Sequence, residues 1–386
     1  MIRFYDLSFN FIGETNVYTS LQFNRNWYGC GDFELHINRY SVINARPAVL
    51  LWDVIYATIN DPLKELIIQV DGDEKKVGIV NFDASNFNNN GKISEDLILK
   101  GKELKYLSHR ATVYPAILGT TYEITDNVET VIKTLIDDNQ GPSAAAARQL
   151  TGLIIDTDTG EGDSIYYSAQ NYPFLDVEIE KIATDNDVGW WYEFDGTNIT
   201  VYFSEGRDCT RGQEIIDPVI LDQFAGLAEG EYSHNDKFYY NVIIAKGKPE
   251  NDTVTDLYKI YPEASIPTSF RRRELFKEFD VIITEAGDAF DNLDNAVAQY
   301  IAGATQELYL NGKALNTGAM QYETNYNLGD LIVIQAFGIT QNIRITNIRE
   351  IYEGDKYVQV ELTFGQQLPT LPKLINTQIN DIKKII

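Results

Sequence analysis

The chain has few of the residues from which metal and redox sites are built. Its 386 residues include two cysteines and three histidines. Cys30 and Cys209 lie far apart in the sequence and form no metal-ligand spacing, so we expect two reduced structural thiols, with a disulfide between them as the alternative. None of the histidines, His36, His109 and His234, has a second histidine or a cysteine three or four residues away. The sequence therefore predicts no metal and no cofactor.

Signatures of catalysis are missing as well. The sequence contains no G-x-S-x-G, no phosphate-binding loop and no G-x-G-x-x-G pattern. Carboxylates are abundant, but sequence spacing does not set the roughly 5–9 Å separation that two of them need for glycoside hydrolysis. We therefore predict that the chain is not an enzyme, and we assign no catalytic residue.

Positive charge is scarce. There are 32 Lys and Arg against 57 Asp and Glu, which gives a formal net charge of −25. A protein that neutralises phosphates needs clustered cations, so we expect no sequence-specific binding to nucleic acid and no binding to anionic lipid. The one basic cluster, Arg271–Arg273, is typical of a solvated or salt-bridged face. A contact with the acidic surface of another subunit is the alternative.

Long hydrophobic runs are also absent. No apolar run approaches the roughly 20 residues that a membrane-spanning helix needs, so no membrane span is expected. The N-terminus, Met1–Asp6, lacks the basic and then apolar build of a signal peptide. We expect a soluble chain that is not secreted by the general route.

Aromatic residues, in contrast, make up 12% of the chain, a balance that favours β-sheet surfaces. In residues 1–115, apolar side chains alternate over 21–23 and 33–37 with the period of a half-buried strand. Further strands are predicted at Val49–Tyr56, Leu66–Val70 and Val77–Phe82, with a tight hairpin at Asp71–Glu74 between the last two. This part is predicted to form a small β-barrel-like domain.

Residues 116–235 change to a helical period and predict an α+β middle domain. Val128, Val131, Ile132, Leu135 and Ile136 share one helical face, with Asp126 as N-cap and Glu129 completing a capping box. A second helix is predicted after Pro173 from the repeat of Leu175, Ile179, Ile182 and Ala183. A hairpin of Trp190–Phe194 and Ile199–Phe203 follows.

Residues 236–370 predict a helix followed by a second β-barrel-like part. The predicted elements are a strand at Asn241–Ala245 ended by Gly247 and Pro249, a helix over Leu293–Leu308, and strands at Leu331–Ala336, Ile343–Ile351 and Tyr357–Phe364. The fold class is therefore a β-rich α+β, multi-domain protein with two small β-barrel-like domains and a mixed α/β middle region.

The tail, residues 371–386, carries a separate signal. Ile375, Ile379, Ile382 and Ile386 follow each other at 4-3-4 spacing, which is the apolar seam of a coiled coil. Two heptads are short for such a seam, and a helix packed on its own domain is the alternative.

An acidic stretch, Asp156–Asp163, alternates carboxylates as a calcium loop does. An EF-hand loop needs Gly at its sixth position and Glu at its twelfth, where this chain has Glu161 and Tyr167. A solvated acidic loop is therefore the preferred interpretation.

Several short motifs occur in a fixed order along the chain. Trp27 is followed by Gly31 and Phe33 in a G-x-F-E-L strand, and a G-x-x-L-x-x-L-x-x-R segment ends at Arg110. Later, Leu328, Gly329 and Asp330 form a Leu-Gly-Asp turn, and Arg344 begins Arg-Ile-Thr. Gly accepts positive φ and Asp bonds the backbone of a turn, so Leu-Gly-Asp suits a tight turn before a buried strand.

In this order the motifs resemble the tail-hub, or tail-associated, proteins of siphophages, which are related to the baseplate hub of contractile tails and tailocins. Members of that family tend to read Asp-Tyr-Asp-Leu-Gly-Asp, whereas this chain has Asn325 and Asn327 in place of two acids. The resemblance implies structural rather than catalytic motifs. The same residues, together with Ile375, Ile379 and Ile382, are our interaction candidates.

The resemblance also implies partners and a location. A homotrimer would present two barrel-like domains per subunit as a pseudo-sixfold ring to a distal tail or tail tube protein. A central spike, a fibre or a tape-measure protein would lie on its axis. The expected location is the tail tip of a phage, prophage or tailocin particle, assembled in the cytoplasm of the host bacterium, with a role in host attachment.

Two alternatives come from other classes of protein. Aromatic and acidic residues could line the sugar cleft of a virion-associated enzyme that degrades cell walls. Exposed Trp190 and Trp191 could instead stack on sugars in a glycan-binding module, although core or interface tryptophans are the commoner arrangement.

Overall fold

The structure is a computed structural model. It describes the chain except for residues 44–48, 52, 54–64, 85–93, 116–118, 171, 211–218, 223–225, 237–238, 250–257, 263–264, 284–290, 304–306, 315–319, 337, 354–355 and 366–386.

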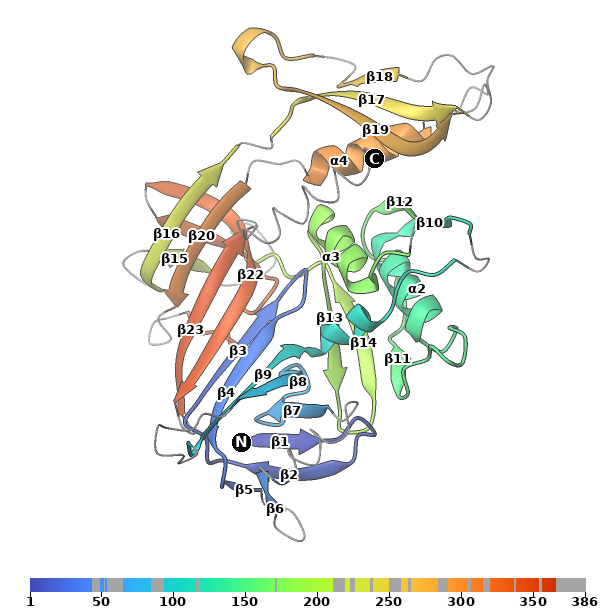
Figure 1. The fold of residues 1–386 in the computed structure, drawn as a ribbon. Coiled ribbons are helices and arrows are strands. Elements are labelled where there is room, and N and C mark those ends of the chain that lie inside the picture. Colours follow the sequence, from blue (N-terminus) through green and yellow to red (C-terminus); the bar gives the residue numbers. More distant parts are fainter. Residues whose placement is uncertain are drawn as a thin grey trace.

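Strands from the first and last parts of the chain form one sheet of 13 strands, which curves along one side and the base of the molecule in Figure 1. Along its main path the strands are β16 (Leu227–Asn235), β20 (Glu307–Ala314), β23 (Lys356–Gly365), β22 (Ile339–Glu353), β3 (Ser20–Asn26), β4 (Asp32–Asn38), β9 (Asp96–Glu103), β8 (Val77–Ala84), β7 (Leu66–Val70), β1 (Ile2–Tyr5) and β2 (Phe11–Thr15). β15 (Ile220–Asp222) and β21 (Leu331–Ala336) join it through β22, while β5 (Val42–Ile43) and β6 (Val49–Leu50) pair with each other.

The first and last β regions of the chain meet in the middle of this sheet. β3 pairs with β22 in antiparallel register from Asn26 opposite Asn347 to Ser20 opposite Glu353. Backbone hydrogen bonds therefore run without a break from the first strands of the chain to the last. The predicted boundaries at residues 115, 235 and 370 stay predictions, but the β regions on either side of the middle domain share a sheet.

The middle of the chain forms a mixed α/β unit against this sheet. It contains the 3-10 helix η1 (Leu104–Arg110), β10 (Tyr122–Asn127), α2 (Val128–Gln140), β11 (Leu153–Ile155), β12 (Ser164–Ala169), α3 (Leu175–Asp185), β13 (Gly189–Phe194) and β14 (Ile199–Ser204). The apolar faces of α2 and α3 share a buried cluster with Ile67, Val77 and Ile79 of the large sheet. The middle unit is therefore packed onto the sheet rather than tethered to it.

A third unit lies at one end of the molecule, at the top of Figure 1. It consists of a three-stranded sheet, β17 (Val242–Pro249), β18 (Tyr258–Tyr261) and β19 (Glu274–Ile283), with the 3-10 helix η2 (Ser269–Arg271) and the helix α4 (Asp291–Gly303). One face of that sheet packs on Leu293 and Val297 of α4. In the described part of the chain, no helix is long and apolar enough to cross a membrane.

The predicted fold class is confirmed: the protein is β-rich with few helices and several sheets. Both middle helices, the β13–β14 hairpin and the β7–β8 hairpin form as predicted. Cys30 and Cys209 are free thiols, as expected. Each of these predictions depended on a regular period or a turn residue, which are local properties of the sequence.

The predicted capping box of α2 is wrong. The N-cap is Asn127, which makes no side-chain capping bond. Glu129 instead lies buried and accepts hydrogen bonds from the backbone N–H of Thr159 and Glu161, at 3.1 and 2.8 Å, and from Lys133 Nζ at 2.6 Å. The acidic stretch 156–163 is therefore the partner of Glu129, and tertiary bonding has replaced the local cap.

Three element boundaries also differ from the predictions. The helix predicted over Leu293–Leu308 ends at Gly303, and Leu308 belongs to β20. β17 runs through Gly247 to Pro249 because the register against β19 shifts there and accommodates the glycine. The strand predicted at Val49–Tyr56 stops at Leu50, since Leu51 and Asp53 are helical.

Replacing Glu129 by Gln should lower the free energy of unfolding by about 3 kcal/mol at pH 7, because Lys133 would be left buried without its counter-ion. Burial opposes ionisation of Glu129, but the Glu161 N–H, Lys133 and Thr159 outweigh it and lower its pKa to about 2. The contribution is therefore complete above the ordinary pKa of 4.5 and is lost as the pH falls towards 2.

Denaturant unfolding at pH 7 and pH 3 checks this, and the difference between wild type and variant should shrink at pH 3. Asp126→Asn is the matched control, since Asp126 is exposed and should matter little. Equal losses in the free energy of unfolding of both variants would instead support the capping box.

Candidate functional site

The loop that joins β3 to β4, residues 27–31, lies where the large sheet and the middle unit meet. Trp27 is buried, and its backbone N–H donates to Thr346 O of β22 at 2.9 Å. Its indole lies against Gly189 of β13 and Gly329, where added Cβ atoms would come within 2.4 and 2.2 Å of the ring. One side chain from the first part of the chain therefore contacts both later parts.

Lys105 fixes this loop through its backbone. Its ammonium donates to three backbone carbonyls, those of Asn26 at 2.5 Å, Trp27 at 3.2 Å and Gly29 at 3.1 Å. It also lies 5.2 Å from the centre of the Trp190 ring. Burial lowers the pKa of Lys105. The lysine is a structural cation whose donors are used by the loop itself.

The Leu-Gly-Asp turn approaches the loop from the other side. Gly329 has φ +86°, as predicted for the turn, and its N–H donates to Ile345 O. The buried carboxylate of Asp330 accepts two hydrogen bonds from Arg207, at 3.0 and 2.5 Å, and one from the Asn327 N–H at 2.7 Å. Such a two-point pair fixes both position and orientation, so the turn is tied to the segment that follows the middle unit.

Arg344 completes the connection. Its Nη1 donates to Gly329 O at 2.5 Å, and its Nε donates to Asp187 at 2.7 Å, just after α3. Its guanidinium carbon lies 5.9 Å from the Trp27 ring. Arg344 thus links β22, the turn and the middle unit at one point.

A buried ion network crosses the β3–β22 junction nearby. Glu350 of β22 pairs with Arg25 of β3 at 3.5 Å and with Lys76 at 2.8 Å, and it accepts a hydrogen bond from the Tyr322 hydroxyl at 2.7 Å. Burial opposes its ionisation, but Arg25 and Lys76 outweigh this and lower the pKa of Glu350. The network therefore holds the two halves of the sheet in one register.

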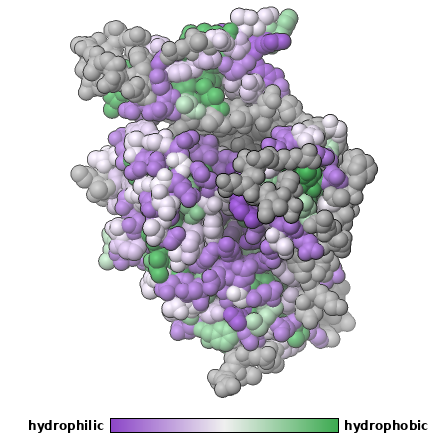
Figure 2. All heavy atoms as spheres, turned by 180° about the vertical axis from the view of Figure 1, so that it is seen from behind, coloured by the Kyte–Doolittle hydropathy of each residue, from purple (hydrophilic) through white to green (hydrophobic). Residues whose placement is uncertain are grey.

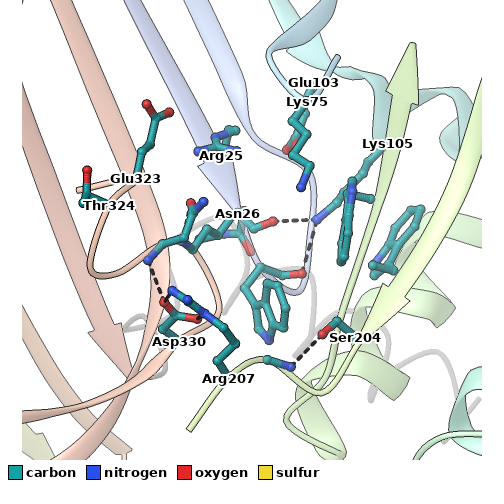
Figure 3. Close-up of a pocket in the computed structure, with 16 residues that line it drawn as sticks. Arg25, Asn26, Lys75, Glu103, Lys105, Ser204, Arg207, Glu323, Thr324 and Asp330 are labelled. Atoms are coloured by element: carbon teal, nitrogen blue, oxygen red, sulfur yellow. Dashed lines mark hydrogen bonds and ion pairs between the residues drawn. The ribbon is translucent and has the colours of Figure 1, made fainter. Parts of the chain in front are cut away.

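A cavity of about 280 Å³ opens at this junction (Figure 3). Its lining comes from the first part of the chain, from the middle unit and the segment after it, and from the last part: Arg25, Asn26, Trp27, Lys75, Glu103, Lys105, Trp190, Trp191, Ser204, Gly206, Arg207, Glu323, Thr324, Asn327, Leu328 and Asp330. In the figure Arg207 faces Asp330, and Lys105 faces the backbone carbonyls of the loop. The arrangement is that of a bonded joint between chain segments.

The structure brings most of the predicted site residues together. Trp27, Gly31, Leu328, Gly329, Asp330 and Arg344 all lie at this junction, which we call the Trp27 junction. Phe33 lies one step away, where its ring packs on Gly78 and Gly101. Arg110 lies apart from the others and pairs with Glu65, and the predicted seam of Ile375, Ile379 and Ile382 falls outside the described residues.

Sequence reasoning missed Lys105, Arg25, Lys76 and Glu350. For Arg25, Lys105 and Glu350 the available signal was a charged residue inside an apolar strand or helix pattern, since such residues are seldom fully buried without partners, whereas Lys76 lies in the turn between β7 and β8 and gave no such signal. The proposal that Trp190 is exposed is wrong: it is 1% exposed and its indole N–H donates to Tyr28 O at 2.7 Å. Trp191 is half-buried and stacks on Tyr202.

The histidines and acids form ordinary contacts. His36 lies between Glu34 and Asp96, and His109 pairs with Asp176. Among the residues that the structure describes, no group of three or more His, Cys, Asp or Glu is placed to hold a metal ion.

A family model described as Siphovirus ReqiPepy6 Gp37-like protein matches residues 1–366. The chain belongs to this siphovirus family. No curated protein sequence matches it.

Three solved structures of similar fold are described as tail proteins, two of them from prophages. A tail protein from Neisseria meningitidis MC58 is 11% identical with a TM-score of 0.54, covering 95% of this chain and 97% of that one. The 43 kDa tail protein of prophage MuSo2 from Shewanella oneidensis is 11% identical with a TM-score of 0.53, covering 95% and 98%. Prophage tail protein gp18 from Listeria monocytogenes EGD-e is 13% identical with a TM-score of 0.52, covering 99% of each chain. The siphovirus family and the tail-protein fold together support a structural component of a phage-type tail.

Gly329→Ala tests the Trp27 junction in this family member. A Cβ there combines a left-handed backbone with a contact of 2.2 Å to the Trp27 ring, so we expect a loss of about 3 kcal/mol in the free energy of unfolding. Gly338→Ala is the matched control, because Gly338 has φ +74° but a Cβ there meets nothing within 4 Å. It should cost about 1 kcal/mol.

Denaturant unfolding followed by tryptophan fluorescence measures both changes. Similar losses in the two variants would mean that backbone conformation alone, and not packing on Trp27, decides the cost.

Proposed function

We propose that three copies of this chain form the hub at the tip of a phage-type tail. The hub joins a hexameric tail tube to a central spike or fibre and surrounds the exit channel. Its other neighbours are a distal tail protein and a tape-measure protein. The role is structural, and the motif residues of the Trp27 junction hold the subunit in shape rather than perform catalysis.

The observation that carries the proposal is the pairing of β3 with β22. It places the β strands of the first and last parts side by side in one rigid sheet. A subunit with two such β regions offers two neighbouring contacts, so a closed ring of three copies offers six. That number matches a sixfold tube.

Charge supports the same role. A formal net charge of −25 makes a channel wall that repels DNA, so a genome can pass through without sticking. Arg207 and Asp330 pair with each other, and Lys105 is bonded to backbone carbonyls, which suits a structural joint better than a reaction centre.

Light scattering and negative-stain imaging of the purified protein at micromolar concentration test the proposal. We expect a mass three times the 43.8 kDa of the chain, seen as a ring with an axial opening. The ring should also bind the end of a tail tube made from the tube protein of the same particle.

A monomer that also fails to bind the tube end would refute the hub. Loss of turbidity in a cell-wall suspension would instead favour the wall-degrading alternative, and specific binding on a glycan array would favour the glycan-binding one. The hub predicts neither.

A further inference from the structure

A short arm projects from the third unit. It is the segment Ser265–Arg273 between β18 and β19, which stands out in gold from the rest of the chain in Figure 1. At its tip Phe270 is 103% exposed, more than any other large hydrophobic residue of the described chain, and Ile266 on the same arm is exposed as well. A phenylalanine ring held entirely in water is an unusual feature for a soluble surface.

No other large hydrophobic residue of the described chain is exposed to this extent. The face seen in Figure 2 is mostly hydrophilic, and its hydrophobic atoms gather in separate small patches. The next most exposed phenylalanines, Phe276, Phe11 and Phe174, each keep about half of their surface covered. Phe270 is distinguished by its place at the end of a projection.

The base of the arm is firmly braced. Asn241 donates from Nδ2 to Arg271 O at 2.6 Å and accepts from the Arg273 N–H at 2.8 Å. Arg273 pairs with Asp236 at 2.8 Å, and Arg272 is bonded to Glu274. Ser269, next to the tip, has φ +56°, a conformation that an ordinary residue adopts only when its surroundings hold it there. These contacts fix the base of the arm, and an arm whose base is already ordered loses less entropy when its tip binds a partner.

Charge gives the arm a preferred partner. Residues 265–273 contain three arginines and no acid in a chain whose formal net charge is −25. Two of the arginines brace the arm, whereas Arg271 forms no ion pair with any described residue. The tip thus offers a phenylalanine and an available guanidinium, and aromatic and arginine side chains are the ones most often found at the centre of protein interfaces.

We propose that this arm docks on the acidic surface of a second copy of the chain. The inference rests on the proposed ring, whose closure requires a contact between two different surfaces of neighbouring copies. A projecting basic tip on one copy and the acidic body of the next are such a pair. Electrostatic attraction steers the tip, and burial of Phe270 holds it.

The first test compares oligomeric state on dilution. Phe270→Ser and Arg271→Glu should each raise the concentration at which the trimer dissociates by at least tenfold. Phe11→Ser and Lys181→Glu are the controls: the first removes an exposed phenylalanine at the opposite end of the molecule, and the second makes the same charge change on exposed Lys181 of α3 (Figure 1). Both should dissociate as wild type does, and all four should keep the wild-type circular dichroism spectrum.

The outcomes separate the two proposals. If the wild type is a trimer and both arm variants dissociate at the same concentration as it does, the docking of the arm is overturned and the proposed hub is not affected. A wild-type chain that stays monomeric at every concentration, with and without tube protein, counts against the ring and with it against this docking.

A second test does not depend on stability. A photo-reactive benzoylphenylalanine at position 270 should give covalent dimers and trimers on irradiation, with the linked peptide coming from an acid-rich surface of another copy. Links confined to the same chain, or links that form only to a different protein of the particle, would overturn the proposal.

Discussion

The indole of Trp27 is the contact on which the rest of this structure depends. It fills the space between Gly189 and Gly329, two glycines from later parts of the chain whose missing side chains leave room for it. Lys105 and Arg344 then fix the loop and the turn on either side. Three parts of the chain share one buried ring. A movement of any one of them at this point would therefore disturb the packing of the Trp27 ring. In the proposed hub, such a shared contact would keep the parts of the subunit in one arrangement.

The polar contacts around the ring have a cost as well as a benefit. Lys105, Glu350 and Asp330 are all nearly or fully buried, and desolvation alone would favour apolar residues of similar size. Buried polar contacts add geometric specificity, since a guanidinium or an ammonium can bond its acceptors in only a few orientations. We interpret the network as a device that fixes the register of β3 against β22, where a slip of one residue would turn the buried side chains of the slipped strand to the opposite face.

Local patterns allowed the sequence to predict most elements, including both middle helices and the Leu-Gly-Asp turn. They failed where a distant partner decided the outcome. Glu129 looked like a capping residue because Asp126 precedes it by three positions, yet besides Lys133 its partners lie about thirty residues on. Leu308 continued a helical stripe, but pairing of its segment with β16 and β23 makes it part of a strand. The joining of the first and last parts through β3 and β22 has no local signature at all.

The site followed the same division. Glycine and aromatic motifs led to Trp27, Gly329 and Arg344, because close packing demands particular residue types at particular positions. The buried ions gave weaker signals, since in the sequence Lys105 or Glu350 is one of many charged residues, and little in the local pattern distinguishes it from those on the surface. The arm shows the converse case: Arg271–Arg273 was visible as the one basic cluster, but only the fold shows that two of the three arginines brace a projection and that Phe270 stands at its end. A charge cluster therefore becomes informative once the structure separates the charges used within the chain from those left for a partner.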